Sequence, residues 1–197
     1  MRYIKIWEEF ISKNIKSEKE LSDKLTEFEV PIDTWGQGQA KTVKHLFDEL
    51  QHEECHIEDR GGFLVRYLEF VGVRIFYKKG EEILYLKEDR QEFNDGRTRK
   101  REMPSSVSEK MKFGENPQLA AIRGIKEELG IYVKPEQLIK QRDLNYRGGS
   151  LSYPGLTSKY KGHQFTCYLT EQQFNPEGYI EKQEDKSTFF TWVKYEA

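Results

Sequence analysis

Residues 114–131 of this chain read GENPQLAAIRGIKEELGI, and this stretch decides the fold. Its large apolar side chains recur at the spacing of one face of an α-helix. They are Leu119, Ile122, Ile125 and Leu129. Gly130 follows them and is typical of a helix end. We therefore predict a helix that ends at Gly130 and follows a long, polar and irregular loop over residues 97–116.

The same helix carries charged residues away from its apolar face. Arg123 and Glu127 are separated by one helical turn, so their side chains are neighbours on the helix surface. Glu128 is the next residue round the helix. The pattern predicts a helix with an apolar face toward the core and a group of acids on its polar side.

The order of these residues resembles the signature of the Nudix superfamily, G-x5-E-x7-R-E-U-x-E-E-x-G-U, in which U is a bulky aliphatic residue. Seven of the nine named positions agree, and they are Glu115, Arg123, Ile125, Glu127, Glu128, Gly130 and Ile131. Two positions differ. Glu109 stands where the signature begins with Gly, and Gly124 stands where a Glu follows the Arg.

The pattern around the signature predicts an α+β protein. Residues 62–79 and 81–93 are rich in β-branched and aromatic residues and are separated by Gly80, which predicts a β-hairpin. The resemblance implies a Nudix-like α/β/α sandwich with a mixed sheet over residues 61–197. Residues 1–60 have helical spacing, for example at Ile4, Trp7, Phe10 and Ile11, and we expect them to form an N-terminal helical extension.

The resemblance also implies a metal site. Acids of the signature hold Mg²⁺, or Mn²⁺ in its place, and the ion bridges the oxygens of a diphosphate during attack by water. We expect Glu128 to be the main ligand, with Glu127 and Glu115 beside it. Arg123 is expected to pair with Glu115 or Glu127 and to hold the loop against the helix. A late loop offers further acids as a base, and these are Glu177, Glu181 and Glu184.

Two segments are candidates for substrate contacts. The basic cluster at Arg97, Arg99 and Arg101 precedes the signature and offers cations for phosphate groups. Tyr153 lies in an aromatic and Gly-rich segment, residues 148–163, that offers a ring for stacking. A solvated loop and a surface turn are the alternative interpretations.

Residues 52–56 read HEECH and match the H-E-x-x-H pattern, in which two His one helical turn apart bind Zn²⁺. Val43, Leu46 and Leu50 predict the buried face of this helix, which would leave Glu49, His52 and His56 on the solvent side. We therefore favour a solvated polar face over a zinc site.

Charge and composition exclude several classes of function. The formal net charge of −2 is too small for general attraction to nucleic acid. The sequence has no apolar run of the roughly 18–20 residues that cross a bilayer. Its two cysteines do not suggest a secreted disulfide framework. We expect a cytoplasmic protein without a membrane segment.

Two functions remain open from the sequence. The first is a divergent Nudix-type hydrolase that cleaves a diphosphate linkage in a nucleoside diphosphate derivative. The second is an inactive Nudix-like domain that binds a phosphorylated small molecule or a protein partner, because Gly124 removes one carboxylate of the signature. A homodimer is an expectation from the resemblance.

Overall fold

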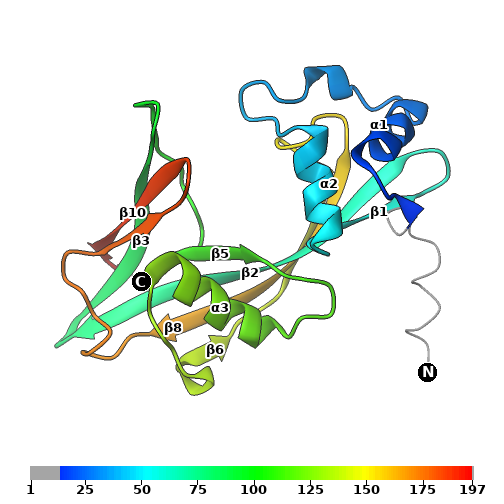
Figure 1. The fold of residues 1–197 in the computed structure, drawn as a ribbon. Helices are drawn as coiled ribbons and strands as arrows, with labels where there is room; N and C mark the ends of the chain where they lie inside the picture. The colour runs from blue at the N-terminus through cyan, green and yellow to red at the C-terminus, as the bar shows by residue number, and fades with distance from the viewer. Residues whose placement is uncertain (1–13, 197) are drawn as a thin grey trace, which may run out of the picture. The chain divides into compact units, whose positions relative to one another are not determined.

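The computed structural model describes residues 14–196. Within that range three α-helices, two short 3-10 helices and ten strands follow one another (Figure 1). The helices are α1 (Glu18–Glu27), η3 (Ile32–Thr34), α2 (Val43–Gln51), α3 (Pro117–Leu129) and η4 (Pro135–Gln137). The strands are β1 (His56–Asp59), β2 (Leu64–Lys79), β3 (Glu82–Phe93), β4 (Thr98–Arg99), β5 (Val107–Lys110), β6 (Leu138–Lys140), β7 (Leu144–Gly149), β8 (Thr157–Tyr168), β9 (Tyr179–Lys182) and β10 (Lys186–Lys194). The predicted helix around Ile4, Trp7, Phe10 and Ile11 lies outside the described residues.

The strands form one mixed sheet, as predicted. The main path has the order β6-β8-β2-β3-β10-β9, with β1 and β5 paired to β2, β4 to β3, and β7 to β8. The hairpin predicted at Gly80 is present, because Lys79 pairs with Glu82 in antiparallel register. β2 and β8 run parallel: Lys159 and Lys161 reach Tyr67 and Glu69, and further along Leu169 donates to the carbonyl of Phe76. The chain is therefore α+β with both kinds of strand pairing.

Contacts between residues group the chain into two compact units. Unit 1 contains residues up to Glu69, together with Met111–Gly114 and Leu144–Lys161. Unit 2 contains Phe70–Lys110, Glu115–Asp143 and the chain from Gly162 onward. Thus the N-terminal helices group with segments from much later in the sequence. The division at residues 60 and 61 stays a prediction about independent domains.

The N-terminal helices form most of the core of unit 1. Ser17 caps α1, since its hydroxyl accepts a hydrogen bond from the backbone N–H of Glu20 at 3.2 Å. α1 and α2 pack together with their apolar faces inward. The core residues that they and η3 bury include Leu21, Leu25, Leu46 and Leu50, with Trp35 and Tyr153 beside them. Burial of these apolar side chains stabilises the packing of the N-terminal helices in unit 1.

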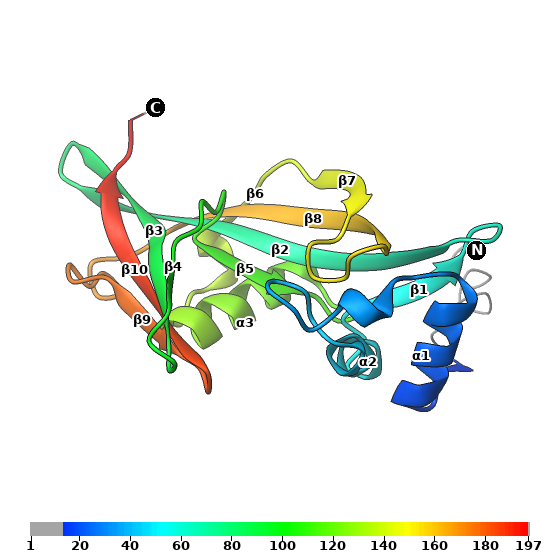
Figure 2. The ribbon, with the colours of Figure 1, turned by 90° about the horizontal axis from the view of Figure 1, so that it is seen from above.

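In unit 2, helix α3 packs along β5, and both lie side by side in Figures 1 and 2. The predicted apolar face is partly wrong, because Leu119 is 60% exposed. The buried residues of α3 are mainly small and are Ala120, Ala121, Gly124, Ile125 and Leu129. Small side chains allow the helix backbone to approach the strand closely, and that approach sets the geometry of the signature region.

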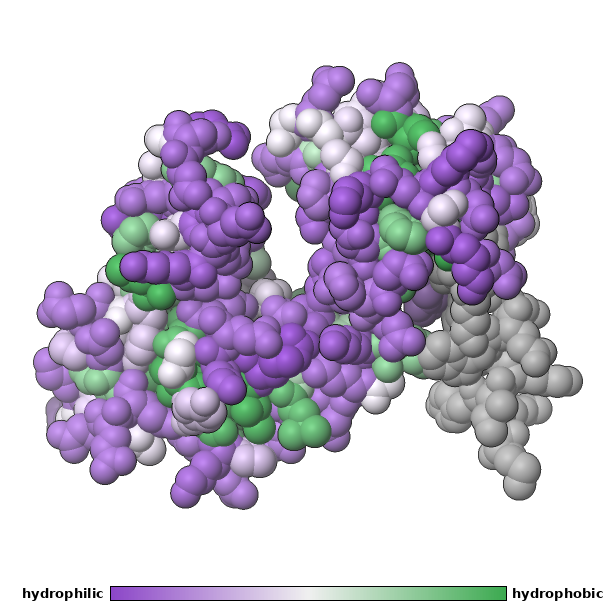
Figure 3. Space-filling model, viewed as in Figure 1, coloured by the Kyte–Doolittle hydropathy of each residue, from purple (hydrophilic) through white to green (hydrophobic). Residues whose placement is uncertain are grey.

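The described surface bears on two expectations from composition. No helix within residues 14–196 is long and apolar enough to cross a membrane. On the face drawn in Figure 3, hydrophilic residues predominate and apolar residues form small groups among them. Cys55 and Cys167 are both buried, and neither takes part in a disulfide in the described part of the chain.

Candidate functional site

Local sequence signals place the signature loop and helix. The side chain of Asn116 caps α3 by accepting from the backbone N–H of Gln118 at 2.9 Å and of Leu119 at 3.3 Å. Pro117 occupies the first turn, where a missing N–H costs nothing. Gly130 ends the helix in the left-handed conformation at φ 70°, as predicted. These caps set the two ends of α3, the helix that carries the acids of the signature.

Arg123 holds the loop, the helix and β5 together. Its Nε and Nη2 donate to the two carboxylate oxygens of Glu115, each at 3.1 Å. Its Nη1 donates to Glu109 at 2.9 Å and to Glu127 at 3.3 Å, and Nη2 also reaches the carbonyl of Lys110 at 3.0 Å. Hydrogen bonds to Glu115, and then to Glu109, raise the pKa of the guanidinium above its ordinary value. The predicted positioning role of Arg123 fits this arrangement, and it involves one more acid than expected.

Gly124 faces β5 and not solvent. A Cβ added there would lie 2.9 Å from Cβ of Glu109 and 3.3 Å from Cγ1 of Val107. Real Cβ atoms essentially never come that close, so a larger residue at position 124 would displace β5 or the helix. The glycine is therefore required by the packing of α3 on β5.

Glu128 lies in an environment that disfavours its charge. Burial and the nearby negative charges of Glu181 and Glu109 raise the pKa of Glu128 to about 9. A backbone hydrogen bond from Ser108 and the charge of Arg101 act in the opposite direction. Of the three late acids that the sequence offered as a base, Glu181 on β9 is the one whose charge acts on Glu128. Carboxylates from β5 and β9 thus act on Glu128 of α3.

The predicted metal ligands are not assembled as expected. Arg123 binds Glu109, Glu115 and Glu127, whereas Glu128 is the acid on which the charges of Glu181 and Glu109 act. Across residues 14–196 no group of three or more His, Cys, Asp or Glu side chains is arranged to hold a metal ion. Carboxylate oxygens still suit Mg²⁺, which usually takes one or two carboxylates and completes its coordination with water and substrate phosphates. The donor chemistry of Glu128 and the acids that act on it therefore fits the ion, although these acids are not arranged as a ready-made group of ligands.

The predicted basic cluster is dispersed. Arg97 pairs with Asp95 at 2.7 Å, and Arg99 is exposed on β4. Arg101 makes a bidentate pair with Glu88, with both N–O distances 2.7 Å, and Glu88 is buried. Arg101 is the member of this cluster whose charge acts on Glu128, so it is the one placed to meet a phosphate at the signature.

The expectation that Tyr153 contacts a ligand is wrong, because its side chain is fully buried in unit 1. Its ring lies 5.1 Å from that of Trp35, and the guanidinium of Arg66 lies 5.0 Å above it. Arg66 in turn pairs with Glu49, and both are buried. Sequence spacing had placed Glu49 among solvated residues, so this buried ion pair is a further correction.

The zinc interpretation of residues 52–56 also fails on secondary structure. Helix α2 ends at Gln51, with His52 as its C-cap, and His56 is the first residue of β1. The two His therefore do not lie one helical turn apart on a common helix, as the motif requires. His56 stacks on Tyr67 with ring centroids 4.9 Å apart, and burial lowers the pKa of His56 to about 4.

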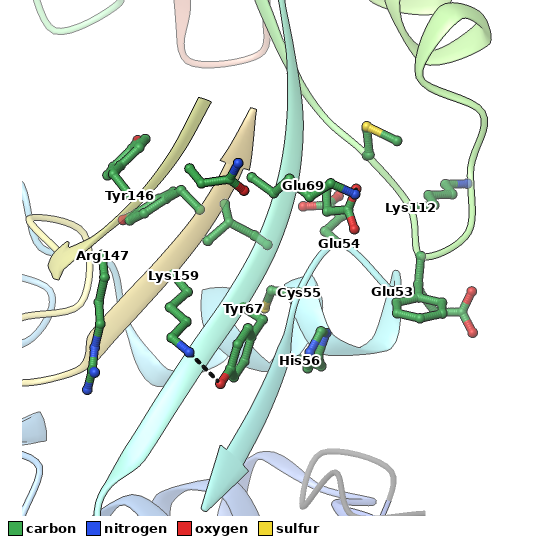
Figure 4. A pocket seen from close by; sticks show the side chains of 16 residues that line it. Glu53, Glu54, Cys55, His56, Tyr67, Glu69, Lys112, Tyr146, Arg147 and Lys159 are labelled. Atoms are coloured by element: carbon green, nitrogen blue, oxygen red, sulfur yellow. Dashed lines mark hydrogen bonds and ion pairs between the residues drawn. The ribbon is translucent and has the colours of Figure 1, made fainter. Parts of the chain in front are cut away.

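Unit 1 contains a pocket of about 480 Å³, a size common for small-molecule sites (Figure 4). Tyr146 on β7 and Tyr160 on β8 form one wall as a stacked pair, with ring centroids 4.5 Å apart. Lys159 points toward Tyr67 and donates to its hydroxyl at 3.3 Å. The charged residues in the lining are Lys112, Arg147, Lys159 and Lys161 with Glu53, Glu54 and Glu69. Tyr160 belongs to the aromatic segment that the sequence marked for stacking, whereas the rest of the pocket was not predicted.

Comparisons with known proteins found similarity to solved structures only. No family model matches the chain, and no curated protein matches it. A crystal structure of an Ap4A hydrolase from C. elegans is 18% identical and covers 65% of this chain and 80% of its own, with a TM-score of 0.36. The E. coli dihydroneopterin triphosphate pyrophosphohydrolase is 23% identical over 64% of this chain and 79% of its own, with a TM-score of 0.38. A MutT/nudix family protein from Enterococcus faecalis is 13% identical over 89% of this chain and 56% of its own, with a TM-score of 0.45.

These three solved structures are at most 23% identical to the chain and their TM-scores are below 0.5. The Nudix resemblance therefore rests on the signature loop and helix and not on these structures. Nothing about substrate follows from them.

Proposed function

We propose that this protein is a divergent Nudix-type hydrolase that uses Mg²⁺, or Mn²⁺, to cleave a diphosphate linkage in a nucleoside diphosphate derivative. The observation that supports the proposal most is the environment of Glu128, where burial and two further carboxylates disfavour the ionised form. A divalent cation beside these acids would offset the repulsion between them. A site of this kind is suited to binding a cation together with an anionic substrate.

The residues have separate tasks in this proposal. Glu128 would hold the cation, which when bound would supply charge stabilisation for the diphosphate and lower the pKa of water. Arg123 positions the loop by its bidentate pair with Glu115 and does not touch the substrate. Arg101, held by the buried Glu88, places a positive charge near Glu128 for a phosphate group.

An assay of hydrolysis tests the proposal. The purified protein is incubated with Mg²⁺ or Mn²⁺ and a panel of nucleoside diphosphate derivatives, beside Glu128→Gln and the exposed control Glu136→Gln. We expect turnover by the wild type and the control and loss of turnover in Glu128→Gln. Hydrolysis that survives in Glu128→Gln, or no hydrolysis of any compound by the wild type, would count against the proposal.

A second candidate function is binding without hydrolysis, and the pocket in unit 1 supports it. The stacked pair of Tyr146 and Tyr160 offers an aromatic wall, and several lysines offer charge for a phosphorylated small molecule. In this case calorimetry would show a nucleoside diphosphate binding without added metal. Tyr146→Ala would weaken that binding, whereas Tyr132→Ala, an exposed aromatic outside the pocket lining, would leave it unchanged.

Two further expectations stay as proposals. We propose a cytoplasmic location and a homodimer, both from the resemblance and the composition. Light scattering coupled to size exclusion measures the oligomeric state, and a monomeric mass at all concentrations would exclude the homodimer.

A further inference from the structure

The two departures from the signature meet in space. Glu109 and Gly124 are far apart in sequence, and each taken alone is the loss of a signature residue. In unit 2, however, a Cβ on Gly124 would lie 2.9 Å from Cβ and 3.4 Å from Cγ of Glu109. The side chain of Glu109 therefore begins in the space that a side chain at position 124 would need.

This contact makes the two positions mutually exclusive. A Glu at position 124 would have to start inside the van der Waals envelope of Glu109, and neither Cβ is a flexible end that can move aside. With glycine at 124, by contrast, no Cβ of the helix opposes the Cβ of Glu109. One carboxylate side chain fits between α3 and β5, and here it comes from the strand.

The carboxylate of Glu109 is directed to the signature residues. It accepts a hydrogen bond from Nη1 of Arg123 at 2.9 Å, and its side chain is 28% exposed. It is also one of the two acids whose charge acts on Glu128. Positions 124 and 128 are one helical turn apart on α3, so the side chain of Glu109 lies beside the turn that also carries Glu128.

We propose that Glu109 supplies, from β5, the carboxylate that position 124 lacks, so that Glu109 and Glu128 together hold the divalent cation. That these two carboxylates hold a cation rests on the proposed function. That Glu109 occupies the space of a side chain at position 124, which we call the exchange, rests on packing alone. The carboxylate of the signature has then moved from the helix to β5 and has not been lost. The alternative is that Glu109 only helps to fix Arg123.

Binding of Mn²⁺ alone, followed by electron paramagnetic resonance and calorimetry, separates these roles. Glu109→Gln keeps the shape of the side chain and removes its charge, and we expect it to weaken Mn²⁺ binding by about tenfold or more. Glu115→Gln is the matched control, since Glu115 makes two hydrogen bonds to Arg123 and Glu109 makes one. If Glu109 acted only through Arg123, Glu115→Gln would weaken binding at least as much, and that result would overturn the inference.

An exchange of residues provides the second test. Glu109→Gly should bind Mn²⁺ as weakly as Glu109→Gln, and the double variant Glu109→Gly/Gly124→Glu should recover affinity to within about threefold of the wild type. Gly124→Glu alone should lower the unfolding temperature, because it adds a carboxylate where Glu109 already lies. A double variant that folds and binds no better than Glu109→Gly would contradict the exchange. If the double variant does not fold, the Mn²⁺ affinity of Glu109→Gln still tests the inference.

The outcomes distinguish this inference from the proposed function. Mn²⁺ binding that depends on Glu109, without turnover of any compound, supports the exchange and removes the hydrolase. Turnover that is lost in Glu128→Gln and unchanged in Glu109→Gln keeps the hydrolase and removes the exchange. A wild type that does not bind Mn²⁺ overturns the inference.

Discussion

Gly124→Ala is the smallest change that tests how tightly α3 packs on β5. In an unconstrained helix it would stabilise the protein by about 1 kcal/mol, because alanine has the higher helix propensity. Here the added Cβ would lie 2.9 Å from Cβ of Glu109. Overpacking of this kind costs about 1–3 kcal/mol. We expect the packing cost to exceed the propensity gain and the variant to lose about 1 kcal/mol.

Gly124→Ala in variants with a different residue at position 109 separates the packing cost from the gain in helix propensity. In Glu109→Gly the opposing Cβ is absent but the 3.3 Å contact with Cγ1 of Val107 remains, so Gly124→Ala should be close to neutral, which gives a coupling energy of about 1 kcal/mol between the positions. In Glu109→Ala the Cβ remains without the carboxylate, so Gly124→Ala should lose as much as in the wild type. This control distinguishes steric contact from charge.

Urea unfolding followed by circular dichroism measures these differences. A change of 1 kcal/mol corresponds to roughly 2–4 °C in Tm for a domain of this size, so thermal scans provide an independent check. If Gly124→Ala stabilises the wild type, or if the coupling to Glu109→Gly is zero, the close approach of α3 and β5 is not as described. The inference about the exchanged carboxylate would then lose its geometric basis.

Three further perturbations follow from the ion pairs and the titration of the site. Because the pKa of Glu128 is raised from 4.5 to about 9, its contribution to stability is complete below pH 4.5 and is lost as pH rises through 9. Without divalent cations, the stability of Glu128→Gln relative to the wild type should therefore increase as pH rises within that window, and parallel pH profiles of urea unfolding would contradict this. Arg66→Met should cost about 3 kcal/mol, since it removes the buried guanidinium that pairs with the buried carboxylate of Glu49; an unchanged urea midpoint would refute it. Arg123→Lys should cost about 1 kcal/mol and loosen the loop at Glu115, because lysine cannot form the bidentate pair, and hydrogen exchange of the loop amides would detect it.

The sequence predicted those parts of the fold that depend on neighbouring residues. Gly130 ends α3 where the repeat of apolar residues stops, and Gly80 lies in the turn between β2 and β3. The pair of Arg123 and Glu127 follows from helix geometry alone, since residues four apart are neighbours on any α-helix. Such features need no knowledge of the rest of the molecule.

Errors arose where burial depends on distant segments. The repeat around Leu119 indicated a helix correctly, but the strand that covers α3 decides which face is buried. Tyr153 and Glu49 were assigned to the surface, although both lie in the interior of unit 1. Local composition could not show this, because the residues that cover them come from other parts of the chain.

By itself the sequence determined the signature: its spacing identifies the loop and helix and shows which carboxylate is missing at Gly124. Only the tertiary structure decided that Glu109 fills the space beside that glycine and that Glu181 acts on Glu128. The physical reason is that these contacts join α3 to β5 and β9, and such non-local contacts arise from packing of the sheet and helix. The sequence of one helix does not show which other segments pack against it.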